Sequence, residues 1–297
     1  MKKRLFQWRL RKKMTPFLLI LPAIALFCVF SFYPIVYAGW ISLHKWQVLG
    51  GHNFVSFSNY IKLLGDHTFH YAVKITFLYI AGVLPLVIGL SLAFALLLTT
   101  SRRIYGRGFF KTSIFIPSIT PLLAMGLLWR FIYSYEYGIF NYYLIQLGFE
   151  KMPWLNSFTW ALPTVIITAA WHAIGWNMII FIAGIQAIPE QLYEAARIDG
   201  ADKRTILRYI TLPLLKPTLL FVGIMASIGA FKAFGLIWGL TRGGPGTATT
   251  TLMVAVYTKS FVEYRMGMGA ALTFFLLVII IIITILQLRV FRSESVY

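Results

Sequence analysis

One long polar segment, residues 190–218, interrupts an otherwise apolar chain, and its ordered residues suit docking against another protein rather than catalysis. Within it, Glu-Ala-Ala is followed after three residues by Gly, and after nine more by Ile, one further residue and Leu-Pro. The alanines allow close approach of a partner surface, and the glutamate offers that surface a hydrogen-bonding anchor. An amphipathic connector lying on lipid headgroups would explain the basic residues of the segment but not the glutamate beside two alanines. The candidate docking residues are Glu194, Ala195, Ala196, Gly200, Ile210, Leu212 and Pro213.

The docking segment is predicted to fold as two short helices joined by a turn. Pro189 suits the start of a helix because its missing N–H has no intrahelical partner there, and residues 191–198 are mostly good helix formers. Gly200 permits a positive φ and therefore marks a break. Asp202 is a suitable cap for a second helix over residues 203–210.

The composition places most of the chain in lipid. Of its 297 residues, 59% are hydrophobic and only 12% are charged, with a mean hydropathy of +0.76, whereas about a quarter of an average soluble domain is charged. The net charge of +18 lies in short stretches between apolar runs, which favours orientation in a membrane and contact with anionic lipid over binding to nucleic acid.

Six apolar stretches are long enough to cross a bilayer as helices. Strands would need alternating apolar and polar residues, which are absent. The fold class predicted is an all-α integral membrane protein, a single transmembrane domain over residues 1–297 with the docking segment, residues 189–213, between the fourth and fifth spans. The second docking helix is expected to end at Pro213. The predicted spans cover about residues 16–43, 71–98, 112–133, 160–183, 214–235 and 268–288.

The distribution of basic residues predicts the orientation of these spans. The two termini, the loop after the second span and the polar segment over residues 190–218 together carry 18 Lys and Arg, against 7 in the loops of the opposite side. The positive-inside rule therefore predicts a multi-pass protein with both termini and the docking segment in the cytoplasm. A cleaved signal peptide is the alternative for the N-terminus, but the apolar run continues to Leu43, beyond the length of a signal sequence.

No catalytic or metal site is predicted. The chain lacks a G-x-x-x-x-G-K-[ST] phosphate loop, so any ATP hydrolysis must reside on a partner. The glycine-rich residues 242–246 are either a contact for a solute receptor or a plain turn. The histidines are scattered, and only His67 and His70 are spaced as neighbours on a helix. An ion-driven carrier or a channel is the alternative function, but such proteins usually carry acidic residues in their spans, and the six predicted spans have none.

Polar and aromatic residues in the fourth and fifth spans are candidates for a solute pathway. Polar groups at membrane depth usually face the protein interior, and small molecules are bound in mostly apolar cavities that carry a few polar and aromatic groups. Packing is the alternative role for the aromatic residues, and for Lys232 the alternative is to extend toward the membrane surface. The candidates are Trp171, His172, Trp176, Asn177, Ser227, Phe231, Lys232 and Phe234.

The docking segment resembles the EAA motif of permease subunits in binding-protein-dependent ABC importers, and every fixed position of that motif is matched here. The wider stretch GIQAIPEQLYEAARIDGADK resembles permeases of the maltose/glycerol-phosphate type, as do GRGFFKTSIFIPS from Gly106 and LTRGGPGTATTTL from Leu240. The likeness covers nearly the whole chain and implies the type I importer permease architecture.

This resemblance implies a non-catalytic permease subunit in a bacterial cell membrane that carries a carbohydrate or related solute inward. The implied partners are a second, homologous permease subunit, two cytoplasmic ATPase subunits and an extracytoplasmic solute-binding protein. The chain itself would bind no cofactor, since ATP and Mg²⁺ would be bound by the ATPase. The docking residues would be seated in a groove of the ATPase and would transmit its motion to the fifth span. The sequence leaves open which solute is carried and which outer loops contact the binding protein.

Overall fold

The computed structural model describes residues 15, 17–47, 50–100 and 105–290, except for the side chain of Thr100. The basic residues before the first predicted span lie outside this part of the chain, as do Arg102, Arg103 and Arg292. The chain divides into two compact units, Met1–Leu63 with Thr258–Phe274, and Leu64–Tyr257 with Phe275–Tyr297. The single domain over residues 1–297 stays a prediction, and each unit is described by itself.

The first unit contains a long apolar helix over Phe17–Ser42, whose second half comprises a π-helical turn, η1 (Cys28–Phe32), and α2 (Tyr33–Ser42). Two short strands that the sequence analysis did not predict follow, β1 (His44–Trp46) and β2 (His52–Phe54), paired antiparallel with His44 opposite Phe54. Helix α3 (Ser58–Leu64) begins beside them, and the π-helical turn η4 (Thr258–Val262) and the start of α15 (Met266–Val290) complete the unit. The side chain of Asn59 donates hydrogen bonds to the carbonyls of Ser42 and His44, at 2.7 and 2.9 Å, and so fixes the end of the long helix.

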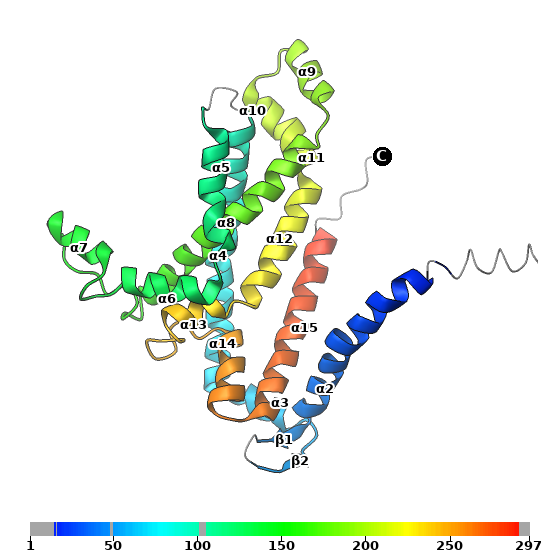
Figure 1. Cartoon of the computed structure of the whole chain (residues 1–297), viewed down its shortest axis with the longest axis vertical. Helices are drawn as coiled ribbons and strands as arrows, with labels where there is room; N and C mark the ends of the chain where they lie inside the picture. Colours follow the sequence, from blue (N-terminus) through cyan, green and yellow to red (C-terminus); the bar gives the residue numbers. More distant parts are fainter. Residues whose placement is uncertain (1–14, 16, 48–49, 101–104, 291–297) are drawn as a thin grey trace, which may run out of the picture. The chain divides into compact units, whose positions relative to one another are not determined.

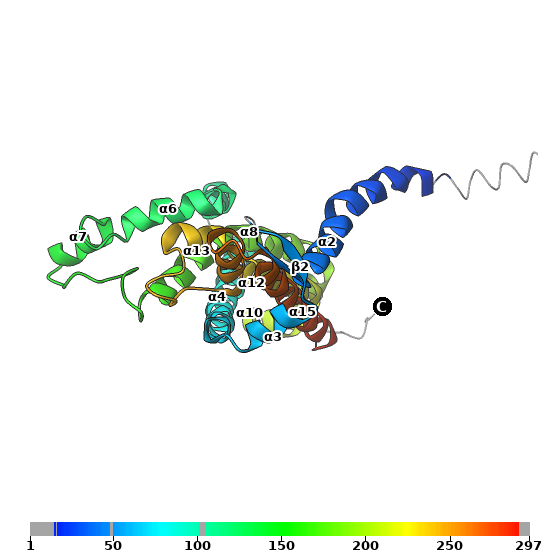
Figure 2. The ribbon, with the colours of Figure 1, turned by 90° about the horizontal axis from the view of Figure 1, so that it is seen from below.

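The second unit is built around three long helices, α4 (His67–Thr100), α8 (Ala161–Gln186) and α12 (Lys216–Phe231). In Figure 1 the short helices α9 (Glu190–Ile198) and α10 (Lys203–Ile206) lie at one end of this unit. Helices α6 (Leu122–Ile132) and α13 (Gly235–Leu240) lie side by side in both views (Figures 1 and 2). The remaining elements are α5 (Arg107–Phe115), η2 (Ile116–Ile119), α7 (Ile139–Gln146), η3 (Leu207–Thr211), α11 (Leu212–Leu214) and α14 (Leu252–Tyr257).

Close packing of α4, α8 and α12 forms the core of the second unit. Phe181 and Met178 of α8 and Val222 of α12 are fully buried there. The hydroxyl of Ser91 in α4 donates a hydrogen bond of 3.0 Å to the carbonyl of Ile174 in α8. Lipid is as apolar as the helix surfaces, so the hydrophobic effect does not drive helices to associate within a bilayer. Tight packing and hydrogen bonds of this kind hold them together instead.

The span over residues 112–133 stays a prediction, and its helix is broken in the structure. Residues Arg107–Ile119 and Leu122–Ile132 form two helical pieces that meet at an angle of 100°. Pro117 and Pro121 lie on either side of the break. They account for it because proline cannot donate the backbone hydrogen bond that would continue the helix. The break is held against α8: Ser118 donates to the carbonyl of His172, at 2.6 Å, and the Nε2 of His172 donates to the carbonyl of Thr120, at 3.1 Å.

The fifth predicted span is also shorter and more broken than expected. Helix α12 ends at Phe231, residues 232–234 are not helical, and α13 follows. By length and composition, four helices in the described part of the chain are able to cross a membrane, or up to six if each bent pair counts as one span. The predicted all-α class is confirmed, and the broken helices are the main departure from it.

Candidate functional site

The docking segment folds as the sequence analysis predicts at its first helix and its turn. Helix α9 begins after Pro189 and ends at Ile198. Gly200 has a φ of +78° and donates to the carbonyl of Arg197, while Ala201 donates to that of Ala196, at 3.1 and 2.9 Å. These two bonds form the helix ending that requires a left-handed residue, and glycine adopts that conformation at little cost.

The second docking helix departs from the prediction. Asp202 caps it as expected, accepting a hydrogen bond of 2.9 Å from the Thr205 N–H. Hydrogen bonds from the Thr205 side chain and then its backbone hold the pKa of the Asp202 carboxyl below its usual value. The α-helix, however, lasts only to Ile206 and continues as the π-helical turn η3. The chain then stays helical through α11 to Leu214, one residue beyond the end predicted at Pro213, and turns by 63° before α12.

The surface of the docking segment is partly apolar and open. Glu194 and Ala195 are exposed, and Leu192 and Ile198 are 41% and 86% exposed, whereas Ala196 is buried within the segment. Ala196 therefore packs inward instead of offering a small surface to a partner. Among the described residues, no ion pair is formed by Glu194. The exposed carboxylate and apolar residues of α9 are suited to contact with another protein.

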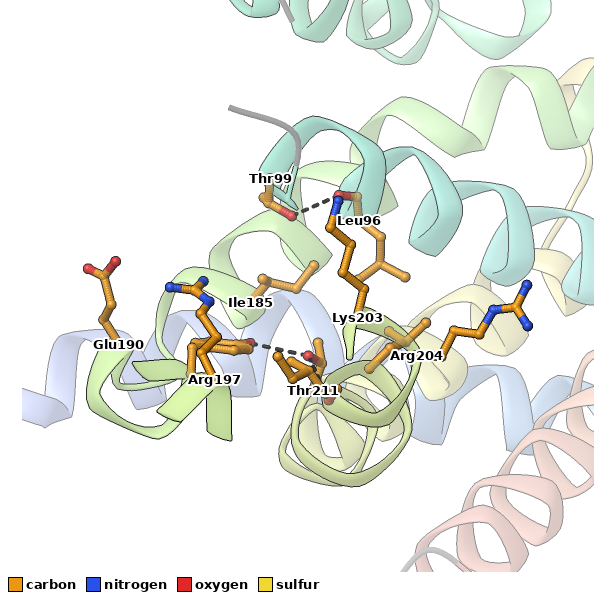
Figure 3. Close-up of a pocket in the computed structure, with 11 residues that line it drawn as sticks. Leu96, Thr99, Ile185, Glu190, Arg197, Lys203, Arg204 and Thr211 are labelled. Atoms are coloured by element: carbon orange, nitrogen blue, oxygen red, sulfur yellow. Dashed lines mark hydrogen bonds between the residues drawn. The ribbon is translucent and has the colours of Figure 1, made fainter. Parts of the chain in front are cut away.

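A cavity of about 480 Å³ lies between the docking segment and the ends of α4 and α8. Figure 3 shows Glu190 and Arg204 on opposite sides of this cavity, with Lys203 between them near the end of α4. The hydroxyls of Tyr193 and Thr211, 3.3 Å apart, join α9 to η3 across it. This bond ties the first docking helix to the turn that leads into α12.

A larger cavity of about 580 Å³ lies among α4, α6, α8, α12 and the non-helical residues after α12. Its wall is mainly apolar and aromatic, with a few polar groups. The lining residues are Tyr79, Val83, Val87, Leu122, Ala169, His172, Ala173, Trp176, Asn177, Ile180, Phe221, Met225, Ala226, Gly229, Ala230, Lys232, Ala233, Phe234 and Leu236. We refer to it as the central cavity.

The structure brings five of the eight predicted pathway residues to the central cavity, from α8 and from the end of α12. They are His172, Trp176, Asn177, Lys232 and Phe234. Part of the hydrogen-bonding capacity of two of them is already used. The Nε2 of His172 holds the Thr120 carbonyl, and the amide N–H of Asn177 donates to the carbonyl of Ala173, at 2.8 Å.

Three predicted pathway residues lie elsewhere. The ring of Trp171 packs against that of Trp129, with ring centres 5.1 Å apart, in an aromatic cluster outside the lining. Ser227 is buried and hydrogen-bonded to Gln287 of α15, at 2.8 Å. Phe231 is 1% exposed and packs on Phe77. A solute pathway through the central cavity thus leaves these three residues with packing roles.

Several lining residues were not predicted, because their own sequence carries no signal. Tyr79 stands in the middle of an apolar helix, and Phe221, Met225 and Gly229 resemble ordinary span residues. Only the packing of α4 against α8 and α12 brings them to one space. No pattern within a single span predicts this arrangement.

The glycine-rich loop after α13 is held by its own hydrogen bonds. Thr250 donates to the carbonyl of Gly243, at 3.0 Å, and Thr249 donates to that of Gly244, at 2.9 Å. The backbone of the loop is therefore occupied internally, while the side chain of Arg242 is exposed. Both interpretations of this loop, as a receptor contact or as a plain turn, stay predictions. Among the described residues, no group of three His, Cys, Asp or Glu is arranged to hold a metal ion.

Comparison with known proteins identifies the family. The family of the binding-protein-dependent transport system inner membrane component matches residues 86–295. The trehalose/maltose transport system permease protein of Thermococcus litoralis is 35% identical, covering 93% of each chain. The sn-glycerol-3-phosphate transport system permease protein of Agrobacterium fabrum is 36% identical over 96% of this chain and 97% of its own. The arabinooligosaccharides transport system permease protein of Bacillus subtilis is 33% identical over 96% of this chain and 91% of its own.

The fold is shared with a solved structure. A bacterial ABC transporter involved in the import of the acidic polysaccharide alginate has a chain that matches with a TM-score of 0.82 at 22% identity, covering 97% of this chain and 99% of that one. The matching family and relatives support a permease and not an ion-driven carrier or a channel. The chain therefore belongs to the inner membrane components of binding-protein-dependent transport systems, as a multi-pass, non-catalytic permease subunit of an ABC transporter.

Proposed function

We propose that this chain forms part of the path by which a carbohydrate or related solute enters the cell, and that the central cavity is its site on this subunit. The carrying observation is the cavity itself, which combines the rings of Trp176 and Phe234 with polar side chains in a mainly apolar wall. Aromatic faces suit the apolar faces of sugar rings, and the few polar groups fix their hydroxyls. The relatives point to the same class of cargo, since their names include trehalose/maltose, sn-glycerol 3-phosphate and arabinooligosaccharides.

Energy for transport is proposed to enter through the docking segment. The exposed Glu194 and Ile198 would be seated against a cytoplasmic ATPase subunit, and the hydroxyl pair Tyr193–Thr211 would pass the motion toward α12. ATP and Mg²⁺ would be bound by that ATPase, so that this chain needs no cofactor of its own. A rigid helix pair that takes up two positions is a suitable element for such coupling.

The proposed assembly contains this chain, a second homologous permease, two ATPase subunits and an extracytoplasmic solute-binding protein. A solved relative of the fold is a bacterial alginate ABC transporter in complex with a pentasaccharide-bound periplasmic protein. The excess of basic residues at the termini and in the docking segment supports a cytoplasmic position for both termini and for α9 and α10.

The coupling is tested by reversing the charge of Glu194. Glu194→Lys should abolish both transport and the ATPase activity that the loaded binding protein stimulates, because the anchor would become repulsive to its site. The residue is exposed, so membrane insertion and the fold should be retained. Glu150→Lys is the matched control, since Glu150 is also exposed but lies in an outer loop. Full coupled transport by Glu194→Lys would refute the docking assignment.

A further inference from the structure

The central cavity contains a cation and no carboxylate, and this imbalance bears on the charge of the cargo. Lys232 lines the cavity, and none of the lining residues is Asp or Glu. The ion pairs formed among the described residues do not include Lys232. The other polar side chains of the lining, Tyr79, His172 and Asn177, are not anionic groups at neutral pH. Lys232 is therefore the charged residue of a mainly apolar lining, and it is exposed in this chain.

The broken helix fixes this lysine beside the cavity. Lys232 is the first residue after α12, and its N–H donates to the carbonyl of Ile228, at 3.1 Å. The carbonyl end of a helix favours a positive charge nearby. The apolar helix α13 follows at Gly235–Leu240, so the lysine stands within the apolar stretch and not at its end. This position favours a role in the cavity over extension to the membrane surface.

An exposed cation with no carboxylate among the lining residues attracts anions, and a bound anionic group accepts a charge-assisted hydrogen bond from it. Sugar hydroxyls would accept its hydrogen bonds but would leave the charge unbalanced. The nearby polar groups do not balance it either. The imidazole of His172 is bound to the Thr120 carbonyl through Nε2, and Asn177 is a neutral amide.

We infer that Lys232 makes the central cavity selective for an anionic carbohydrate, meaning a sugar or polyol that carries a phosphate, sulfonate or carboxylate group. The inference rests on the proposed function, in which this cavity carries a carbohydrate. Lys232 supplies the charge that binds the anionic group, while Trp176 and Phe234 supply the faces for the carbon skeleton. The names of the relatives include both neutral and phosphorylated cargoes, so similarity alone does not decide the charge.

The test uses the complete transporter, with its partner permease, ATPase and binding protein, in proteoliposomes. ATP-driven uptake is measured for two pairs of probes, glycerol 3-phosphate against glycerol and trigalacturonate against maltotriose. The variants are Lys232→Met, which removes the charge, and Lys232→Arg, which retains it. Lys74→Met is the matched control, because Lys74 lies exposed on α4 outside the cavity lining. Each variant is compared with the wild type on the same probe, so that selection by the binding protein cancels.

The wild type should take up at least one anionic probe. Lys232→Met should lower that uptake about tenfold or more, since a hydrogen bond between charged groups is lost. Lys232→Arg and Lys74→Met should stay within about threefold of the wild type, which is less than one such bond is worth. Co-elution of the subunits on size exclusion establishes that each variant assembles.

Two results would overturn the inference and leave the proposed function intact. One is uptake of neutral probes only by the wild type. The other is a Lys232→Met variant that loses neutral and anionic uptake equally, or that fails to assemble, while Lys232→Arg keeps both uptake and assembly. That result is expected if Lys232 pairs with a carboxylate of the partner permease. If neither kind of carbohydrate is taken up by an assembled, ATP-hydrolysing wild type, the proposed cargo class itself fails.

Discussion

The docking segment and the central cavity differ in how their residues come together. The docking segment is one continuous stretch, residues 189–213, and its helices and turn follow from local interactions such as the hydrogen bond between Gly200 and Arg197. The central cavity draws its lining from Tyr79 to Leu236, from five helices (α4, α6, α8, α12 and α13) and from the non-helical residues between the last two. The fold of the docking segment is therefore fixed by contacts between residues close in sequence, whereas the cavity depends on how distant helices break and pack.

The largest effect is expected at the turn of the docking segment. Gly200→Pro should reduce coupled transport to background, because proline requires a φ near −65° and the native φ is +78°. Proline also removes the N–H that donates to the Arg197 carbonyl. The measurement is ATPase activity stimulated by the loaded binding protein, together with uptake into proteoliposomes.

Gly148→Pro is the control for this prediction. Gly148 has a φ of +83° and follows α7, in the loop that leads to α8, with the same kind of hydrogen bond, to the Ile145 carbonyl at 2.9 Å. Its substitution should disturb that loop and leave the coupling of ATP hydrolysis to the solute intact. An equal coupling defect in both variants would contradict a specific role of the docking segment in coupling ATP hydrolysis to transport.

Two glycines of the second unit differ in the space around them, one in a close helix contact and the other at the central cavity. At Gly239 an added Cβ would lie 2.8 Å from the Leu123 carbonyl oxygen of α6, whereas at Gly229, which lines the central cavity, it would meet nothing within 4 Å. Gly239→Leu should therefore destabilise the protein by about 1–3 kcal/mol through overpacking. Gly229→Leu should keep the melting temperature and lower uptake several-fold by filling the cavity. Thermal unfolding in detergent and uptake assays distinguish the two, and the reverse pattern would contradict the assignment of the cavity.

Two tryptophans five residues apart on α8 have different surroundings. Trp176 lines the central cavity and is 60% exposed, whereas Trp171 packs edge-on against Trp129. Trp176→Ala should lower uptake by about twofold to tenfold through loss of an aromatic contact, with little change in stability. Trp171→Ala should lower stability by about 1–3 kcal/mol and change uptake little in the protein that remains folded. Equal effects of both substitutions on uptake would indicate that Trp171 also contributes to the solute pathway.

The smallest effect is expected at the cap of the second docking helix. Asp202→Ala should speed amide hydrogen exchange at residues 203–206, since the Thr205 N–H loses its acceptor, and should change transport less than about twofold. The pKa of this carboxyl is lowered in the folded state, so the cap is complete above the ordinary value of 3.8 and is lost as the pH falls through the lowered pKa. Hydrogen exchange near neutral pH should therefore differ between the variant and the wild type, whereas any difference should shrink in strong acid. Identical exchange at neutral pH would show that the cap does not hold the helix.

Part of this molecule was predictable because the relevant forces act between near neighbours. The left-handed conformation of Gly200 and the cap at Asp202 are set within a few residues. His172 and Trp176, spaced by four residues on one helix, were both predicted as pathway residues and do line one cavity. Ser227, by contrast, is engaged by Gln287, which lies sixty positions away, and its sequence context carries no sign of that contact.

The membrane class, the family and the helix pair that is proposed to receive the motion of an ATPase could be read from the amino-acid sequence alone. They follow from the length of the apolar stretches and from the spacing of residues close in sequence. Only the tertiary structure decided where the third and fifth predicted spans break, which aromatic residues face the central cavity, and that Lys232 stands there without a carboxylate. The physical reason is that helix breaks and cavities arise from contacts between α4, α6, α8 and α12, and each helix alone presents the same apolar surface to lipid and to protein.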